Sequence, residues 1–287
     1  MAIKGDAILR HYMERLVRAF KKPLTMEKLR RALWTFKQPL TKRPELTGAP
    51  VSDLFVWRNS ADWKTFFELT DISGLFVDRE EMSEQYVTLF FFDNKGTLFL
   101  EKRLDMVPNQ RQTLNLSVFL SKSESFFGTF CVFHSYTPKV VSDLGSFIAE
   151  RGYVSYCYNG APLRTYVHGN LDAIAQLPNK RLQPLGGGSL RAREYRLQHE
   201  LLGPALYEVG IVNPTSRNQR LSCQVLSARS GEVFGTQEAQ LRPRGSHVFP
   251  IQVDQSQPSR IVINSHLVMA RPLVFRIRQQ QIDVFHG

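Results

Sequence analysis

The chain has 287 residues, 43% of them hydrophobic and 22% charged, with a formal net charge of +11. These values are typical of a soluble globular protein of one large or two ordinary domains, and they exclude a disordered or fibrous chain. No stretch holds the roughly 20 apolar residues that a membrane-spanning helix needs.

The positive charge is concentrated at the N-terminus. Residues 1–45 hold twelve Lys and Arg against four Asp and Glu, a net charge of +8. Leu9, Met13, Leu16 and Phe20 recur at helical spacing, and a second helical pattern follows the potential N-cap Thr25. The sequence therefore predicts a short α-helical, basic N-terminal arm over residues 1–46.

The arm has two explanations. Its apolar stripes can pack on the rest of the protein, or its cations can contact an acidic partner protein or an anionic membrane surface. Nucleic acid is disfavoured because no reader motif accompanies the charge. The cations that we expect at such a contact are Arg15, Arg18, Lys21, Lys22, Arg30 and Arg31.

Short β-type runs dominate the chain after a Pro- and Gly-containing linker at 42–50. An acidic insertion, Thr70–Ser83, interrupts them. The expected strands are Leu54–Arg58, Thr65–Leu69, Tyr86–Phe92, Thr97–Leu104, Gln112–Val118, Phe126–His134, Leu206–Val212, Arg220–Ala228, Val233–Leu241, Ser246–Val253, Arg260–Ser265 and Pro272–Arg278.

A β-hairpin is predicted over 150–170, with Asn159-Gly160 as a turn that accommodates positive φ. Strand pleating divides its side chains between two faces. The face expected in the core carries Val154, Tyr156, Tyr158, Leu163, Thr165 and Val167. The face expected to be wet and hydrogen-bonding carries Tyr153, Ser155, Cys157, Arg164, Tyr166 and His168.

The polar side of this hairpin is the candidate ligand site. Arg164 can bind a carboxylate or phosphate in a fork, and Tyr phenols can stack on a sugar ring or donate hydrogen bonds. The alternative is that the same cluster joins two domains. The candidate residues are Tyr153, Arg164, Tyr166, His168 and Asn170, and a sugar or nucleotide-sugar is the small ligand that fits them.

An internal repeat is the strongest architectural signal. A gapless offset of 135 positions superposes Gln85–Leu116 on Arg220–Ile251, and turn residues coincide, Gly96 on Gly231 and Pro108 on Pro243. The expected fold is mainly β, with two tandem, internally duplicated antiparallel β-sandwich domains. Their predicted bounds are 51–175, including the hairpin at 150–170, and 195–287, joined by a linker at 176–194.

Each repeat runs strand, Asn-led turn, strand, Gly turn, strand, Pro break and a strand that ends in Ser, as at Ser135 and Ser265. This unit resembles the small β-sandwich of the sensory-rhodopsin transducer family over about 70 residues. The resemblance implies a non-catalytic interaction module that can form homo-oligomers. It transfers no site residues.

The sequence contains no signature of a cofactor or metal site. Its histidines lack ligand spacing, and LGGGSL (185–190) lacks the Lys-Ser/Thr of a phosphate loop. A Cys157 nucleophile activated by His168 is conceivable, but a buried thiol is favoured for all three cysteines, as expected in the cytoplasm. The sequence thus favours a non-enzymatic cytoplasmic binding or scaffold protein, which the arm can hold at a membrane periphery. The alternative is a carbohydrate-binding or carbohydrate-active protein that uses the 150–170 hairpin.

Overall fold

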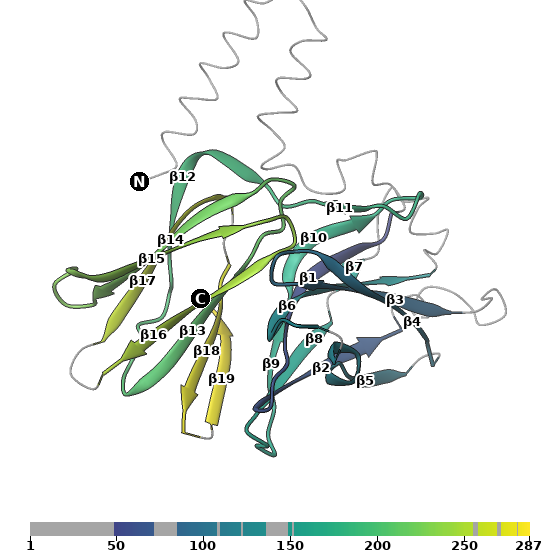
Figure 1. The fold of residues 1–287 in the computed structure, drawn as a ribbon, viewed down its shortest axis with the longest axis horizontal. Coiled ribbons are helices and arrows are strands. Elements are labelled where there is room, and N and C mark those ends of the chain that lie inside the picture. The colour runs from purple at the N-terminus through teal and green to yellow at the C-terminus, as the bar shows by residue number, and fades with distance from the viewer. Residues whose placement is uncertain are drawn as a thin grey trace, which may run out of the picture. The chain divides into compact units, whose positions relative to one another are not determined.

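A computed structural model describes residues 49–71, 85–107, 110–121, 123–135, 149–150, 152–254, 258–268, 271–279 and 281–287. The expected arm at 1–46, its six candidate cations and nearly all of the acidic insertion lie outside these residues. The described chain is mainly β and forms several antiparallel sheets (Figure 1). No described helix is long and apolar enough to cross a membrane.

The first part of the chain forms two of the sheets. One has the order β11-β10-β1-β6-β3-β4, with the short β7 parallel to β1, and the other has the order β5-β2-β8-β9. A helical turn, α3 (Ser117–Leu120), follows β5. The strands are β1 (Val51–Arg58), β2 (Trp63–Thr70), β3 (Tyr86–Asp93), β4 (Leu98–Asp105), β5 (Arg111–Asn115), β6 (Phe127–His134), β7 (Ala149–Glu150), β8 (Tyr153–Tyr158), β9 (Thr165–His168), β10 (Asn170–Gln176) and β11 (Leu182–Pro184).

The second part forms two further sheets, with the orders β12-β17-β14-β15 and β16-β13-β18-β19. The strands are β12 (Gly188–Arg196), β13 (Ala205–Val212), β14 (Gln219–Ser227), β15 (Val233–Leu241), β16 (Ser246–Val253), β17 (Ser259–Leu267), β18 (Leu273–Arg278) and β19 (Gln281–His286). The segment expected as a linker, 176–194, thus contains β11 and most of β12, which pair with β10 and β17.

The four sheets lie like the blades of a four-bladed propeller (Figure 1). Their strand orders differ from the simple meander of consecutive strands, because β13 lies between β16 and β18. Two large hydrophobic clusters fill the spaces between sheets. One takes mainly alternate side chains of its strands, such as Val209 and Ile211, whereas the other takes consecutive side chains from β1, β3 and β6.

One sheet is buried on both of its faces. In the β16-β13-β18-β19 sheet, Val209 and Val274 belong to one hydrophobic cluster, whereas Val212 and Phe275 belong to the other. The Phe275 ring centroid lies 5.3 Å from that of Trp63 in β2. The two parts of the described chain therefore share a continuous core.

Candidate functional site: the outer face of the hairpin sheet

The predicted hairpin is confirmed. Strands β8 and β9 pair antiparallel with Tyr153 opposite His168 and Tyr156 opposite Thr165. Asn159 and Gly160 both have positive φ, 51° and 69°. Such values fit a tight turn whose twist matches the flanking strands.

The division between the two hairpin faces holds for most residues and fails for two. Val154, Tyr156 and Val167 are buried as expected. Leu163 is 82% exposed because it lies in the loop before β9 begins, where pleating no longer determines direction. Ser155, expected on a wet face, is fully buried, and its Oγ has no hydrogen-bond partner in the described structure.

We call the side of the β5-β2-β8-β9 sheet that faces away from the core the hairpin face, and define it by Phe66, Glu68, Tyr153, Ser155, Arg164 and Tyr166. Strand pairing places Phe66 opposite Ser155, and Ser155 opposite Tyr166. Tyr153 is 54% and Tyr166 44% exposed. This face is therefore a solvent-accessible surface with exposed aromatic groups.

Arg164 lies across the hairpin face. Its guanidinium carbon is 4.7 Å from the ring centroid of Phe66 and 5.7 Å from that of Tyr166. The side chain is 30% exposed, and its partners among the described residues are all in the hairpin sheet. The described contacts of Arg164 thus include none with the second part of the chain.

Glu68 holds the cations of this face in place. Its side chain is only 4% exposed, and Oε2 accepts hydrogen bonds from Arg111 Nε at 3.0 Å and from Thr113 Oγ1 at 2.8 Å. Its Oε1 lies 3.8 Å from Arg164 Nη1. A buried carboxylate needs such partners because burial of an unpaired charge is costly. Glu68 is thus engaged by the protein itself.

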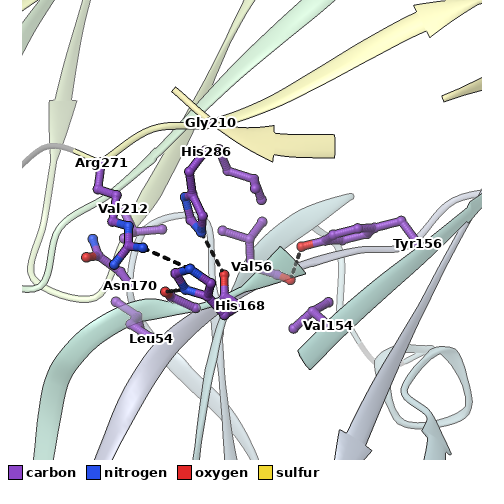
Figure 2. Close-up of a pocket in the computed structure, with 12 residues that line it drawn as sticks. Leu54, Val56, Val154, Tyr156, His168, Asn170, Gly210, Val212, Arg271 and His286 are labelled. Carbon is purple, nitrogen blue, oxygen red and sulfur yellow. Dashed lines mark hydrogen bonds between the residues drawn. The ribbon is translucent and has the colours of Figure 1, made fainter. Parts of the chain in front are cut away.

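His168 and Asn170 lie elsewhere, in a small cavity where the two parts of the chain meet (Figure 2). The cavity has a volume of about 20 Å³, room for about one water molecule. Arg271 and His286 from the second part also line it. Two of the five predicted ligand residues thus contribute to the joint, while Tyr153, Arg164 and Tyr166 stay together on the hairpin face.

The hydrogen-bond partners of His168 determine which of its ring nitrogens carries the proton. Nδ1 lies 2.9 Å from the Gly169 carbonyl oxygen, which can only accept, so Nδ1 carries the proton. Nε2 accordingly accepts from Arg271 Nη2 at 2.8 Å (Figure 2). The His168 nitrogens are therefore occupied by these two partners, and the ring has no free nitrogen with which to activate Cys157.

Across the cavity, His286 Nε2 donates to the His168 carbonyl oxygen at 3.0 Å. Burial, together with the nearby His168 and Arg271, lowers the pKa of His286 to about 4. His286 is therefore neutral near pH 7, so the joint brings an uncharged imidazole next to Arg271 and His168.

Sequence reasoning missed an ion pair at the same joint. Arg58 at the end of β1 donates both guanidinium Nη groups to the Glu208 carboxylate of β13, one bond measuring 3.4 Å. The guanidinium carbon also lies 4.0 Å from the ring centroid of Trp63. Burial lowers the pKa of Arg58 to about 10, which leaves it charged at neutral pH. Neither residue stands in a local pattern that could have identified this pair.

The buried cysteines and the potential metal ligands give little support for a reactive site. Burial raises the pKa of the Cys131 and Cys223 thiols, which disfavours the nucleophilic thiolate. Within the described ranges no group of three or more His, Cys, Asp or Glu side chains is placed to hold a metal ion. The buried-thiol interpretation therefore fits these two cysteines.

Comparison with known proteins identifies no family. No family model and no curated protein matches the chain. Among solved structures, a β-glucuronidase from glycoside hydrolase family 2 matches at 11% identity with a TM-score of 0.15, covering 88% of this chain and 26% of that one. A glycosyl hydrolase family 2 member from Bacteroides cellulosilyticus matches at 7% identity with a TM-score of 0.15, covering 88% and 30%.

This chain spans less than a third of the length of either of these two proteins. At such TM-scores the likeness says nothing about the fold or the activity of this chain. The functional argument therefore depends on its own residues.

Proposed function

We propose that this chain is a non-enzymatic binding protein that holds a partner protein on its hairpin face. The support comes from a comparison of two surfaces of this chain. The hairpin face is exposed, whereas the corresponding face of the β16-β13-β18-β19 sheet is buried against the first part of the chain. The hairpin face offers exposed Tyr side chains and the partly exposed Arg164, residue types enriched among the strongest contributors to protein interfaces.

The correspondence follows from a duplication, which we also propose. The path β1-β6-β3-β4 matches β12-β17-β14-β15, and β5-β2-β8-β9 matches β16-β13-β18-β19. Gly96 and Gly231 turn the matching hairpins with φ of 80° and 74°. Identical strand orders and the offset of 135 support two tandem sandwiches of common ancestry, at 51–175 and 195–287. The resemblance to the sensory-rhodopsin transducer sandwich stays a proposal.

Strand register identifies the matching surface. Phe66, Ser155 and Tyr166 form one row across the first sheet. When β5 is matched to β16 at the offset of 135, the corresponding row in the second sheet consists of Glu208, Phe275 and Val284.

The second row is a docking surface. Phe275 is fully buried, and its ring lies 5.3 Å from Trp63 and 5.0 Å from Tyr156, both in the first part. The fold thus uses the outer face of one sheet to bind another β-sheet structure. The equivalent face of the first sheet has no such cover in the described chain, and it carries the exposed aromatic groups that a partner could bury.

The experiment uses the full chain with Tyr153→Ala and Tyr166→Ala, and Phe234→Ala as an exposed control on β15. Partners captured from a lysate are identified, purified and measured by calorimetry. We expect each Tyr variant to weaken binding by about tenfold or more, the range of interface hot spots, and the control to bind normally. A purified partner that binds all three variants equally contradicts the proposed face.

Carbohydrate binding at the same face is the second candidate. The observation that favours it is the pair of exposed phenols beside a guanidinium, since Tyr can stack on a sugar ring while Arg binds its polar groups. A glycan and nucleotide-sugar screen tests this candidate. If carbohydrate binding is the function, the Arg164→Ala variant should not bind a sugar that the wild type binds.

We also propose that the basic arm, residues 1–46, docks on an acidic protein or an anionic membrane surface in the cytoplasm. The support is its net charge of +8, since each Lys or Arg close to a charged membrane contributes about 1 kcal/mol. Replacement of its six candidate cations by Gln should reduce co-sedimentation with anionic liposomes in low salt. Unchanged sedimentation, or sedimentation indifferent to salt, contradicts this role.

A further inference from the structure

We propose that the partner held on the hairpin face is an acidic protein segment, and that one of its carboxylates binds Arg164 in a fork. This inference rests on the proposed function and adds the chemistry of the partner. It follows from the hydrogen-bonding capacity that Arg164 leaves unused among the described residues, the charge of its surroundings and the apolar tip of the hairpin.

Arg164 is held in one orientation, but its guanidinium N–H groups have no hydrogen-bond acceptor among the described residues. The rings of Phe66 and Tyr166 hold its guanidinium over the sheet, at 4.7 and 5.7 Å. Its contact with Glu68, 3.8 Å between Nη1 and Oε1, is longer than a hydrogen bond. No described residue accepts a hydrogen bond from the Arg164 side chain. A guanidinium held in one orientation by stacking loses less conformational entropy when it binds a carboxylate.

The charge around Arg164 favours an anion. Lys64 and Arg111 lie on the same side of the sheet and are exposed, with 62% of the Arg111 side chain accessible. The carboxylate among them, Glu68, is buried and already hydrogen-bonded to Arg111 and Thr113. Among the described side chains, two of the three positive charges thus remain uncompensated at the surface, which favours a negatively charged partner.

Exposed apolar groups on this face and next to it favour a protein over a free sugar or a phosphate. Leu163, beside Arg164 at the hairpin tip, is 82% exposed, and the phenol rings of Tyr153 and Tyr166 are accessible. An acidic segment that also carries an apolar side chain can bury Leu163 while its carboxylate binds Arg164. The matching row in the second sheet combines the same two features, because Glu208 lies beside Phe275.

The test uses a labelled Glu-Leu-Gly repeat peptide, with a Gln-Leu-Gly peptide as its uncharged counterpart, and fluorescence anisotropy on the full chain in low salt. Variants are Arg164→Gln, Arg164→Lys and the control Arg220→Gln, which removes an exposed cation from β14. Each variant carries the unchanged basic arm, so differences between variants report on the face alone. Thermal unfolding verifies that each variant is folded.

We expect the wild type to prefer the acidic peptide, Arg164→Gln to lower its affinity about tenfold, Arg164→Lys to lower it less, and Arg220→Gln to leave it unchanged. Equal affinities of Arg164→Gln and Arg220→Gln, no preference for Glu over Gln, or tighter binding of a heparin oligosaccharide with the same Arg164 dependence each overturn the inference. If Tyr166→Ala weakens a purified partner while Arg164→Gln does not, the proposed function stands and this inference fails.

Discussion

His168 and His286 occupy matching positions in the two hairpins, and their rings are in tilted contact with each other. Their ring centroids are 4.4 Å apart with 39° between the ring planes. His168 pairs with Tyr153, the first residue of β8, and His286 pairs with Leu273, the first residue of β18. Strands β9 and β19 lie side by side (Figure 1). Equivalent residues of the two hairpins therefore contact each other at this joint.

Acid should weaken this joint through His286. Its pKa is about 4 in the folded protein, against 6.5 for an unperturbed histidine. The unfolded chain therefore binds more protons between these values. The stabilisation is complete above pH 6.5 and is lost as the pH falls toward 4, by at most about 1.4 kcal/mol per pH unit. The groups that face His286, the guanidinium of Arg271 and the imidazole of His168, both disfavour its protonation.

Urea unfolding at several pH values checks this expectation. His286→Gln, whose amide can still donate to the His168 carbonyl, should make stability less dependent on pH over this range. His199→Gln, at an exposed histidine, is the control and should retain the wild-type slope. An unchanged slope in His286→Gln would show that other groups cause the acid sensitivity.

Loss of one partner of the Arg58–Glu208 pair should be more harmful than loss of both. Glu208→Gln or Arg58→Met leaves a largely buried charge without its partner, which costs about 3–5 kcal/mol. The double variant should recover part of that loss, because neither charge remains. Denaturant titration of the two single variants and the double variant measures the coupling. Strictly additive losses would contradict a direct interaction.

Two glycines at matching turns should respond differently to alanine. Both have positive φ, so Ala is strained at each, by about 1 kcal/mol. At Gly96 an added Cβ would also lie 2.1 Å from the Pro243 carbonyl oxygen, whereas at Gly231 it meets nothing within 4 Å. Gly96→Ala should therefore lower the melting temperature well beyond Gly231→Ala. Equal shifts would contradict the close approach of the Gly96 turn to Pro243.

Phe275→Ala should destabilise both parts of the chain together. The side chain is fully buried and packs against Trp63 and Tyr156, so its removal should cost about 3–5 kcal/mol. Tyr166→Ala, on the exposed face, should cost little. Unfolding followed by fluorescence and by circular dichroism should give one coincident transition for the wild type. Two separate transitions would show that the shared core does not couple the parts.

The parts of the fold that could be predicted from the sequence are those determined by neighbouring residues. The hairpin follows from the Asn159-Gly160 turn and from alternation along β8, both of which act over neighbouring residues. The strand runs around Gly96 and Gly231 were predictable for the same reason. The point at which β9 begins was not predictable. Leu163 and Arg164 lie between the turn and β9, where side chains do not follow the pleat, and Leu163 consequently lies in solvent.

The candidate site was predictable in part. Tyr153, Arg164 and Tyr166 do lie together, since one hairpin positions all three. The burial of Ser155 and the engagement of Glu68 depend on side chains that cross between strands far apart in sequence. Arg58 and Glu208, 150 positions apart, meet only because the two parts pack together. The arm at 1–46 remains a prediction.

The doubly buried sheet also sets a limit on how this protein can be divided. A fragment that begins at residue 195 would retain the strands around Val274 but expose Phe275, Val284 and Leu273 to water, and would leave Glu208 without Arg58. Such a fragment should be prone to aggregate, because a contiguous apolar sheet surface without a cover recruits other chains. Laboratory dissection of this protein is therefore better done by point substitutions at the surface than by cutting between the repeats.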